Sequence, residues 1–125
     1  MIPQQTILPV PGSDGFNHLL YELQLTNTLG NPADLRSVKV LDAENGKTLL
    51  TLNAAEIIKG NYLHTLDRQL AMSTSFAPFE GRVLILNLGA ELGGGIPHSL
   101  THRFEVAART RSTRSQRFST IVAGR

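Results

Sequence analysis

The chain has four histidines, the side chains best suited to hold a metal ion or to transfer protons: His18, His64, His98 and His102. His98 and His102 are four positions apart, a spacing that would bring two ligands together on a helix. On a strand the same spacing separates them by about 13 Å, too far for one ion. Pro97 and the neighbouring β-branched and aromatic residues favour a strand. Because His102 is in phase with Leu100 and Phe104, we predict a buried histidine at the rim of the core and no metal site.

Other catalytic groups form no recognisable motif. Ser73 and Ser75 fall in a predicted loop without a nearby base, and no Gly-x-Ser-x-Gly sequence occurs. Asp42 and Glu44 flank a predicted turn, where Asp42 is expected to accept turn N–H groups. No cysteine is present, which excludes disulfides, zinc-thiolate sites and cysteine nucleophiles. We predict no catalytic residue and no cofactor, with a small enzyme using an unrecognised site as the alternative.

Basic residues gather towards the C-terminal end. Residues 101–125 contain six arginines and one acid, whereas residues 1–100 contain six Lys/Arg and nine Asp/Glu. Such asymmetry indicates either a contact surface for a polyanion or protein, or simply a solvated face. Nucleic-acid readers usually combine arginines with aromatic platforms, but Phe104 and Phe118 are in phase with the core, which disfavours nucleic acid. The predicted contact patch for a protein or an anionic surface polymer comprises Arg103, Arg109, Arg111, Arg114 and Arg117.

These side chains must be positioned by a folded domain. The chain has 125 residues, of which 41% are hydrophobic and 18% charged, values typical of an ordered globular protein. We predict one domain, residues 1–125, with a proline- and glycine-rich segment over 1–15 that allows an edge strand at 5–8. No apolar run approaches the length needed to span a bilayer.

Alternation of apolar and polar residues predicts mainly strands. The clearest runs from 17 to 27, with Leu19, Tyr21, Leu23 and Leu25 on one side. Further strands are predicted at 35–42, 47–52, 82–88, 98–109 and 117–123. In the strand at 35–42 we place Arg36 on the same face as Val38 and Val40.

Two local signals add detail. Asn45-Gly46 predicts a hairpin turn, and Asn53 with Glu56 has the pattern of a capping box, predicting a short helix at about 54–59 that covers one end of the sheets. Gly60 is a good C′ residue to end that helix. Residues 61–80 show no clear period. The whole predicts an all-β fold: an immunoglobulin-like antiparallel β-sandwich of about seven strands, without the Cys…Trp…Cys hallmark of antibody domains.

The order of four segments resembles a known family. They are His-Leu-Leu-Tyr-Glu-Leu-Gln-Leu-Thr-Asn (18–27), Val-Lys-Val-Leu-Asp-Ala-Glu-Asn-Gly-Lys-Thr-Leu-Leu-Thr-Leu (38–52), Ala-Pro-Phe-Glu-Gly-Arg-Val-Leu-Ile-Leu (77–86) and Pro-His-Ser-Leu-Thr-His-Arg-Phe-Glu-Val (97–106). Together they resemble the N-terminal non-catalytic β-sandwich module of bacterial lysostaphin-type zinc metallopeptidases. The zinc ligands of those peptidases, His-x-x-x-Asp and His-x-His, do not occur here, so no catalytic residue is carried over.

The resemblance implies an accessory module of an exported bacterial protein. Such a module positions a neighbouring domain or binds a protein or an anionic surface partner, and a self-assembling structural domain is a further alternative. The implied location is periplasmic or extracellular. Residues 1–5 lack the basic and apolar regions of a signal peptide, so either a start methionine replaces a removed leader or the protein is cytoplasmic.

Overall fold

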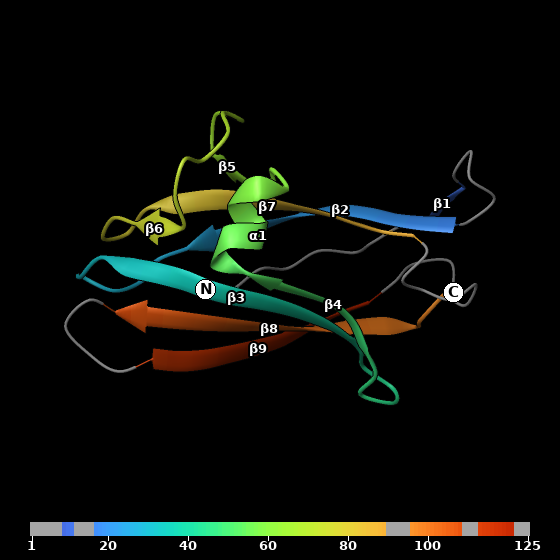
Figure 1. Ribbon diagram of the computed structural model, residues 1–125. Helices are drawn as coiled ribbons and strands as arrows, with labels where there is room; N and C mark the ends of the chain where they lie inside the picture. Colours follow the sequence, from blue (N-terminus) through green and yellow to red (C-terminus); the bar gives the residue numbers. More distant parts are fainter. Residues whose placement is uncertain (1–8, 12–16, 90–95, 109–112, 122–125) are drawn as a thin grey trace.

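The computed structural model describes residues 9–11, 17–89, 96–108 and 113–121 (Figure 1), and the side chains of 18–89 and 96–108. The elements are β1 (Pro9–Pro11), β2 (Asn17–Thr26), β3 (Ala33–Asp42), β4 (Thr48–Asn53), α1 (Ala54–Lys59), β5 (Leu63–Thr65), β6 (Ser75–Phe76), β7 (Gly81–Leu88), β8 (Ser99–Ala108) and β9 (Thr113–Ile121). The predicted edge strand at 5–8 lies outside the described residues, whereas β1 follows it directly.

Two antiparallel sheets face each other (Figure 1). The first has the strand order β1-β2-β7-β5, and the second has the order β4-β3-β8-β9, with β6 pairing beside the start of β3. These are the orders A-B-E-D and C′-C-F-G of immunoglobulin domains. The all-β sandwich prediction is therefore confirmed. The described residues form nine strands, two more than the seven expected. The additional strands are β5 and β6, which have three and two residues and were too short to predict.

The opening strand, β2, has the predicted alternation. Its inward side chains are fully or almost fully buried: Leu19, Tyr21, Leu23 and Leu25. Leu20 and Gln24 are exposed on the other side. Tyr21 pairs with Leu86 of β7, another fully buried residue. Continuous inward apolar rows of this kind give each sheet one face to bury, and the two buried faces make the core.

The predicted phase of β3 is wrong at one point. The register against β8 shifts between Leu35 and Ser37, so one extra residue lies between them. Leu35 and Val38 are both buried, while Arg36 is exposed between them. A β-bulge reverses the alternation at this site, and Arg36 therefore does not share the core face of Val38.

Helix α1 has the predicted bounds and start. The Asn53 side chain accepts from the Glu56 amide at 2.8 Å, and the Glu56 carboxylate accepts from the Asn53 amide at 3.0 Å. The helix connects β4 of the second sheet to β5 of the first, so it crosses an edge of the sandwich and does not cover an end (Figure 1). Gly60 has an ordinary φ of −86°, and the left-handed residue is Asn61, with φ of 59°. Gly60 is required for space, because a Cβ would collide with the Tyr62 ring.

The predicted hairpin turn after β3 is also present. Gly46 has φ of 72° and its amide donates to the Asp42 carbonyl. The Asp42 carboxylate accepts from the Glu44 amide at 2.9 Å, the role predicted for it. None of the helices in the described part of the chain is long and apolar enough to cross a membrane.

Candidate functional site

The chain between β5 and β7 folds back on the edge of the first sheet. The Ala71 amide donates to the Leu63 carbonyl at 3.0 Å, and the Thr65 amide donates to the Gln69 carbonyl at 2.8 Å. Residues 69–71 therefore extend the sheet beyond β5. The connection between β5 and β6 rises above the sandwich (Figure 1).

Polar contacts hold the tight turn at 65–69. The Thr65 hydroxyl accepts from the Gln69 amide at 3.1 Å and donates to the Asp67 carboxylate. Arg68, with φ of 71°, makes an ion pair with Glu22 on β2. The turn is thus fixed at its base by backbone pairing and on its outside by an ion pair to the central part of the first sheet.

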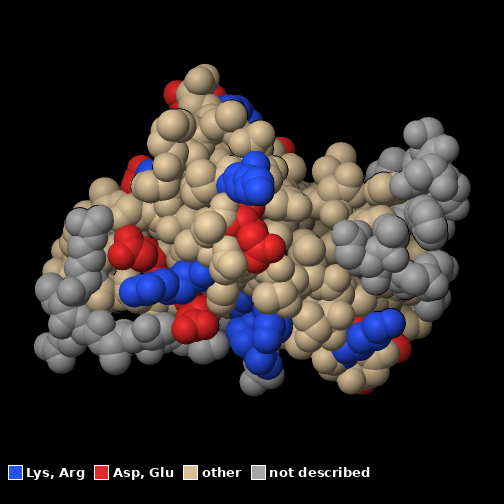
Figure 2. All heavy atoms as spheres, viewed as in Figure 1, with Lys and Arg blue, Asp and Glu red and all other residues tan. Residues whose placement is uncertain are grey.

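This segment presents large apolar side chains to solvent. We call it the 66–79 segment, and its exposed apolar residues are Leu66, Leu70, Met72 and Phe79. Met72 is 88% exposed and Phe79 is 68% exposed. Among the described residues, the one other large exposed apolar side chain is Leu20. In Figure 2 the projection above β7 is mainly uncharged, with acidic and basic atoms at its sides. Large exposed apolar and aromatic side chains are enriched at protein-interaction surfaces.

Phe79 is unusual in its backbone as well as in its exposure. The Glu80 amide donates to the Ala77 carbonyl at 3.1 Å, closing a β-turn with Pro78 second and Phe79 third. Phe79 has φ of 61°. Proline at the second position with a positive φ at the third is the pattern of a type II turn, in which glycine is favoured at the third. A bulky residue there costs about 1 to 2 kcal/mol, and no burial of the Phe79 ring compensates for it.

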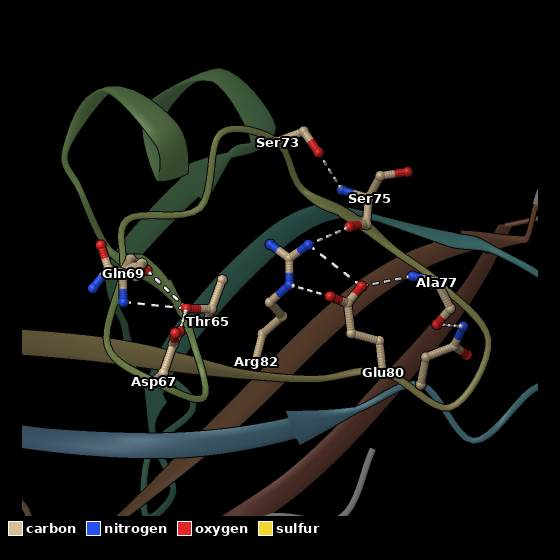
Figure 3. Close-up of polar contacts among 9 residues, drawn as sticks. Thr65, Asp67, Gln69, Ser73, Ser75, Ala77, Glu80 and Arg82 are labelled. Carbon is tan, nitrogen blue, oxygen red and sulfur yellow. Dashed lines mark hydrogen bonds and ion pairs between the residues drawn. The ribbon is translucent and has the colours of Figure 1, made fainter.

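Arg82, on β7, holds this turn from the side of that strand (Figure 3). Its Nε lies 3.1 Å from Glu80 Oε2, and its Nη2 donates to the Ser75 carbonyl at 3.2 Å. The guanidinium carbon lies 5.5 Å from the centre of the Phe76 ring, a cation–π distance. The side chain is 12% exposed. A nearly buried arginine with these partners ties the end of the 66–79 segment to both sheets.

Glu80 also contacts this turn, and we call the contacts that Arg82 and Glu80 make with residues 75–77 the clamp. Its Oε1 accepts from the Ala77 amide at 2.8 Å. The Ala77 amide and the Arg82 guanidinium together hold the pKa of Glu80 below its usual range. Asn27, after β2, donates through Nδ2 to the Ala77 carbonyl at 3.1 Å and to the Asn31 carbonyl at 2.9 Å. The β2–β3 connection and the turn bearing Phe79 are therefore joined at the same end of the sandwich.

The predicted arginine patch is only partly within the described side chains. Arg103 is half-buried on β8, in register with Lys39 on β3 and with Arg117 on β9. These register positions place three cationic residues in one row across the second sheet. Arg114 is in register with Val106. The structure describes neither Arg109 nor Arg111, so the patch as a whole stays a prediction.

The histidines do not converge. His18 Nδ1 lies 2.9 Å from Asn87 Oδ1, and His98 Nε2 lies 3.6 Å from Glu44 Oε1. His64 Nδ1 is buried without a hydrogen-bond partner among the described residues. Within the described part of the chain, no group of three or more His, Asp or Glu side chains could hold a metal ion.

His102 is fully buried, as predicted from its phase. Its Nε2 lies 2.6 Å from the hydroxyl of Tyr21 on the opposite sheet, and its ring stacks on Phe104 with centroids 6.4 Å apart. Burial lowers the pKa of His102 to about 4 and raises the pKa of Tyr21. Both side chains are therefore uncharged at neutral pH, and the pair links the two sheets without a charge.

Comparison with known proteins adds the following. No model of a protein family matches the chain, and no curated protein does. Among matching solved structures is the X-ray structure of a Northeast Structural Genomics Consortium target, SoR45. It is 13% identical, the match covers 99% of this chain and 81% of that chain, and the TM-score is 0.46. A resemblance at this level carries no information on function.

Sequence reasoning missed the 66–79 segment. Its residues show no period, so they gave no strand or helix signal. The one available signal was Pro78-Phe79, where proline precedes a bulky residue at a place in which a turn favours glycine. The contact between Arg82 and Glu80 had no sequence signal of its own, because two opposite charges two positions apart are common in any strand.

Proposed function

We propose that this domain is a non-enzymatic interaction module of an exported bacterial protein. It packs against a neighbouring protein or domain through the 66–79 segment. The observation that carries the proposal is Phe79, which is exposed and occupies a left-handed turn position that favours glycine. Strained residues of this kind persist where function requires them.

The surrounding geometry supports the same role. Met72 and Phe79 belong to the residue types enriched at protein interfaces, and Met72 adapts readily to an irregular partner surface. Asp67 and Arg68 supply a polar border close to Leu66. Arg82 and Glu80 hold the segment in place before binding, which reduces the entropy that association would otherwise lose. The expected partner surface is therefore apolar with polar edges.

A photo-crosslinking residue at position 72 tests this proposal, with the same residue at position 20 as the matched control. Both positions are exposed apolar sites, but only position 72 lies in the 66–79 segment. Envelope extracts should yield one protein crosslinked through position 72 and not through position 20. That protein, purified, should then bind the unmodified domain with a negative heat-capacity change, and Met72→Ser should weaken the binding at least tenfold. Equal crosslinking at both positions, or binding insensitive to Met72→Ser, would contradict the proposal.

A second candidate function rests on the cationic row. Lys39, Arg103 and Arg117 are register neighbours on three adjacent strands, an arrangement that suits an anionic polymer of the cell surface. The probe is heparin, titrated at several salt concentrations. Arg103→Glu should weaken binding and flatten its salt dependence, while Arg36→Glu, at an exposed position outside the row, should change it little. Equal effects of the two substitutions would remove this candidate.

A further inference from the structure

Among the described residues each sheet ends in two edge strands, and three of the four edges carry prolines, charges or a covering segment. The fourth, β4, has an irregular register with β3 at its first residues, between Leu41–Thr48 and Val40–Leu50, and a regular register from Leu50 to Asn53. In the first sheet, β1 contains Pro9 and Pro11, which have no N–H to offer another chain. The opposite edge, β5, is covered by residues 69–71, because the Ala71 amide donates to the Leu63 carbonyl. Proline and covering segments are established means of preventing edge-to-edge pairing.

The two edges of the second sheet differ in sequence. Strand β9 contains Arg114 and Arg117, and charged residues on an edge strand oppose pairing with another chain. Strand β4 is Thr-Leu-Leu-Thr-Leu-Asn, with neither a charge nor a proline. Among the described residues its only strand partner is β3. In the view of Figure 2 the surface over β4 is mainly uncharged.

The pattern of β4 is complementary to itself. Leu50 and Leu52 are in register with Val40 and Val38, so they belong to the core-facing row, whereas Thr51 is exposed on the other face. If two copies of β4 pair antiparallel about a two-fold axis perpendicular to the sheet, residues on one face stay on one face. With Thr51 opposite Thr51, Leu50 lies opposite Leu52 of the partner. Threonine pairs and aliphatic pairs are both favourable cross-strand neighbours.

Charges at the two ends of β4 fit the same arrangement. Lys47 precedes the strand, and Glu56 follows it in the first turn of α1. Antiparallel pairing brings the Lys47 end of one copy beside the Glu56 end of the other. Parallel pairing would instead bring Lys47 beside Lys47 and Glu56 beside Glu56, so this pair of charges favours the antiparallel arrangement.

We propose that β4 pairs with β4 of a second copy of this chain, joining the second sheets of two molecules into one continuous sheet. The contact does not involve the 66–79 segment. A homodimer with this geometry therefore leaves Met72 and Phe79 available. The homodimer and the proposed partner can be tested separately.

The test uses Thr51→Lys and Thr51→Glu, each purified and then mixed, with sedimentation velocity as the readout. The unmodified protein should be dimeric, and each variant alone should be monomeric because like charges meet at the two-fold axis. Mixing the two variants should restore the dimer, because a lysine then faces a glutamate. Gln24→Lys and Gln24→Glu are matched controls on β2, an interior strand, and should remain dimeric.

Hydrogen exchange provides a second readout that needs no substitution. Amides of 48–53 should become more protected as the protein concentration rises, while those of β2 should not change. A monomer at every concentration that the protein tolerates would overturn the proposal. So would dimeric Thr51 variants, or a mixture of the two variants that stays monomeric.

Discussion

The hydroxyl of Tyr21 lies 2.6 Å from Nε2 of His102, and this contact joins the two sheets inside the core. Tyr21 is on β2 and His102 is on β8, the strands that correspond to B and F of immunoglobulin domains. In antibody domains a disulfide connects those same two strands. In this chain, which has no cysteine, a neutral hydrogen bond connects them. This hydrogen bond requires both the Tyr21 hydroxyl and the His102 ring nitrogen.

A double-mutant cycle measures this link. Tyr21→Phe removes the hydroxyl and leaves a buried ring nitrogen without that partner, so the free energy of unfolding should fall by about 1 to 3 kcal/mol. His102→Leu alone should likewise leave the buried Tyr21 hydroxyl without its hydrogen bond to the imidazole. The double variant should lose less than the sum of the two single losses, because replacing both polar partners removes the unsatisfied group. Urea denaturation of the four proteins measures this coupling, and strictly additive losses would show that the two residues act independently.

Burial of His102 also predicts that the stability of the folded protein depends on pH. The pKa of this side chain is 6.5 when unperturbed and about 4 in the folded protein. Between these values the unfolded chain binds a proton that the folded protein does not. Stability should therefore be unaffected by this group above pH 6.5 and should fall as the pH drops from 6.5 towards 4. The total loss is about 3 kcal/mol.

The comparison that isolates this effect is between His102→Leu and His98→Gln. His102→Leu should flatten the stability profile between pH 6.5 and 4, although it lowers stability at neutral pH. His98 is exposed, so His98→Gln should leave the slope unchanged. A slope that survives in His102→Leu would assign the dependence to other groups.

The alternation of apolar and polar residues explains why β2 and its buried face were predictable. Leu19, Tyr21, Leu23 and Leu25 repeat with period two, so a single strand specifies which face is buried. The capping box at Asn53 is equally local, since both of its contacts lie within four residues. The bulge at Arg36 was not predictable, because it depends on the register against β8, a strand more than sixty residues away. The 66–79 segment depends in the same way on contacts with β2, β3 and β7.

Removing the N-cap of α1 should lower the free energy of unfolding by a small amount. Asn53→Ala deletes the acceptor for the Glu56 amide and should lower the free energy of unfolding by about 1 kcal/mol. Gln24→Ala, at an exposed position on β2, should cost less. Thermal unfolding measures both. A loss in Asn53→Ala no larger than in Gln24→Ala would show that the cap contributes little to the stability of α1.

The clamp beneath the 66–79 segment should be detectable by proteolysis. Glu80→Gln keeps an oxygen for the Ala77 amide but removes the charge that faces Arg82. Cleavage within 66–80 should become faster, while cleavage elsewhere should not change. Because the pKa of Glu80 is lowered in the folded protein, the unmodified protein should show the same acceleration as the pH falls below the usual range of a glutamate. Glu44→Gln, at an exposed carboxylate away from this clamp, is the control and should behave as the unmodified protein.

Phe79→Gly tests the central claim most directly, with stability and affinity for the partner crosslinked at position 72 measured on the same samples. Glycine adopts the left-handed turn without strain, so the free energy of unfolding should rise by about 1 kcal/mol. Removing the exposed ring should at the same time weaken partner binding at least tenfold. Higher stability with lower affinity would show that Phe79 is kept for binding at the expense of the fold. Unchanged affinity, or a loss of stability, would contradict the account.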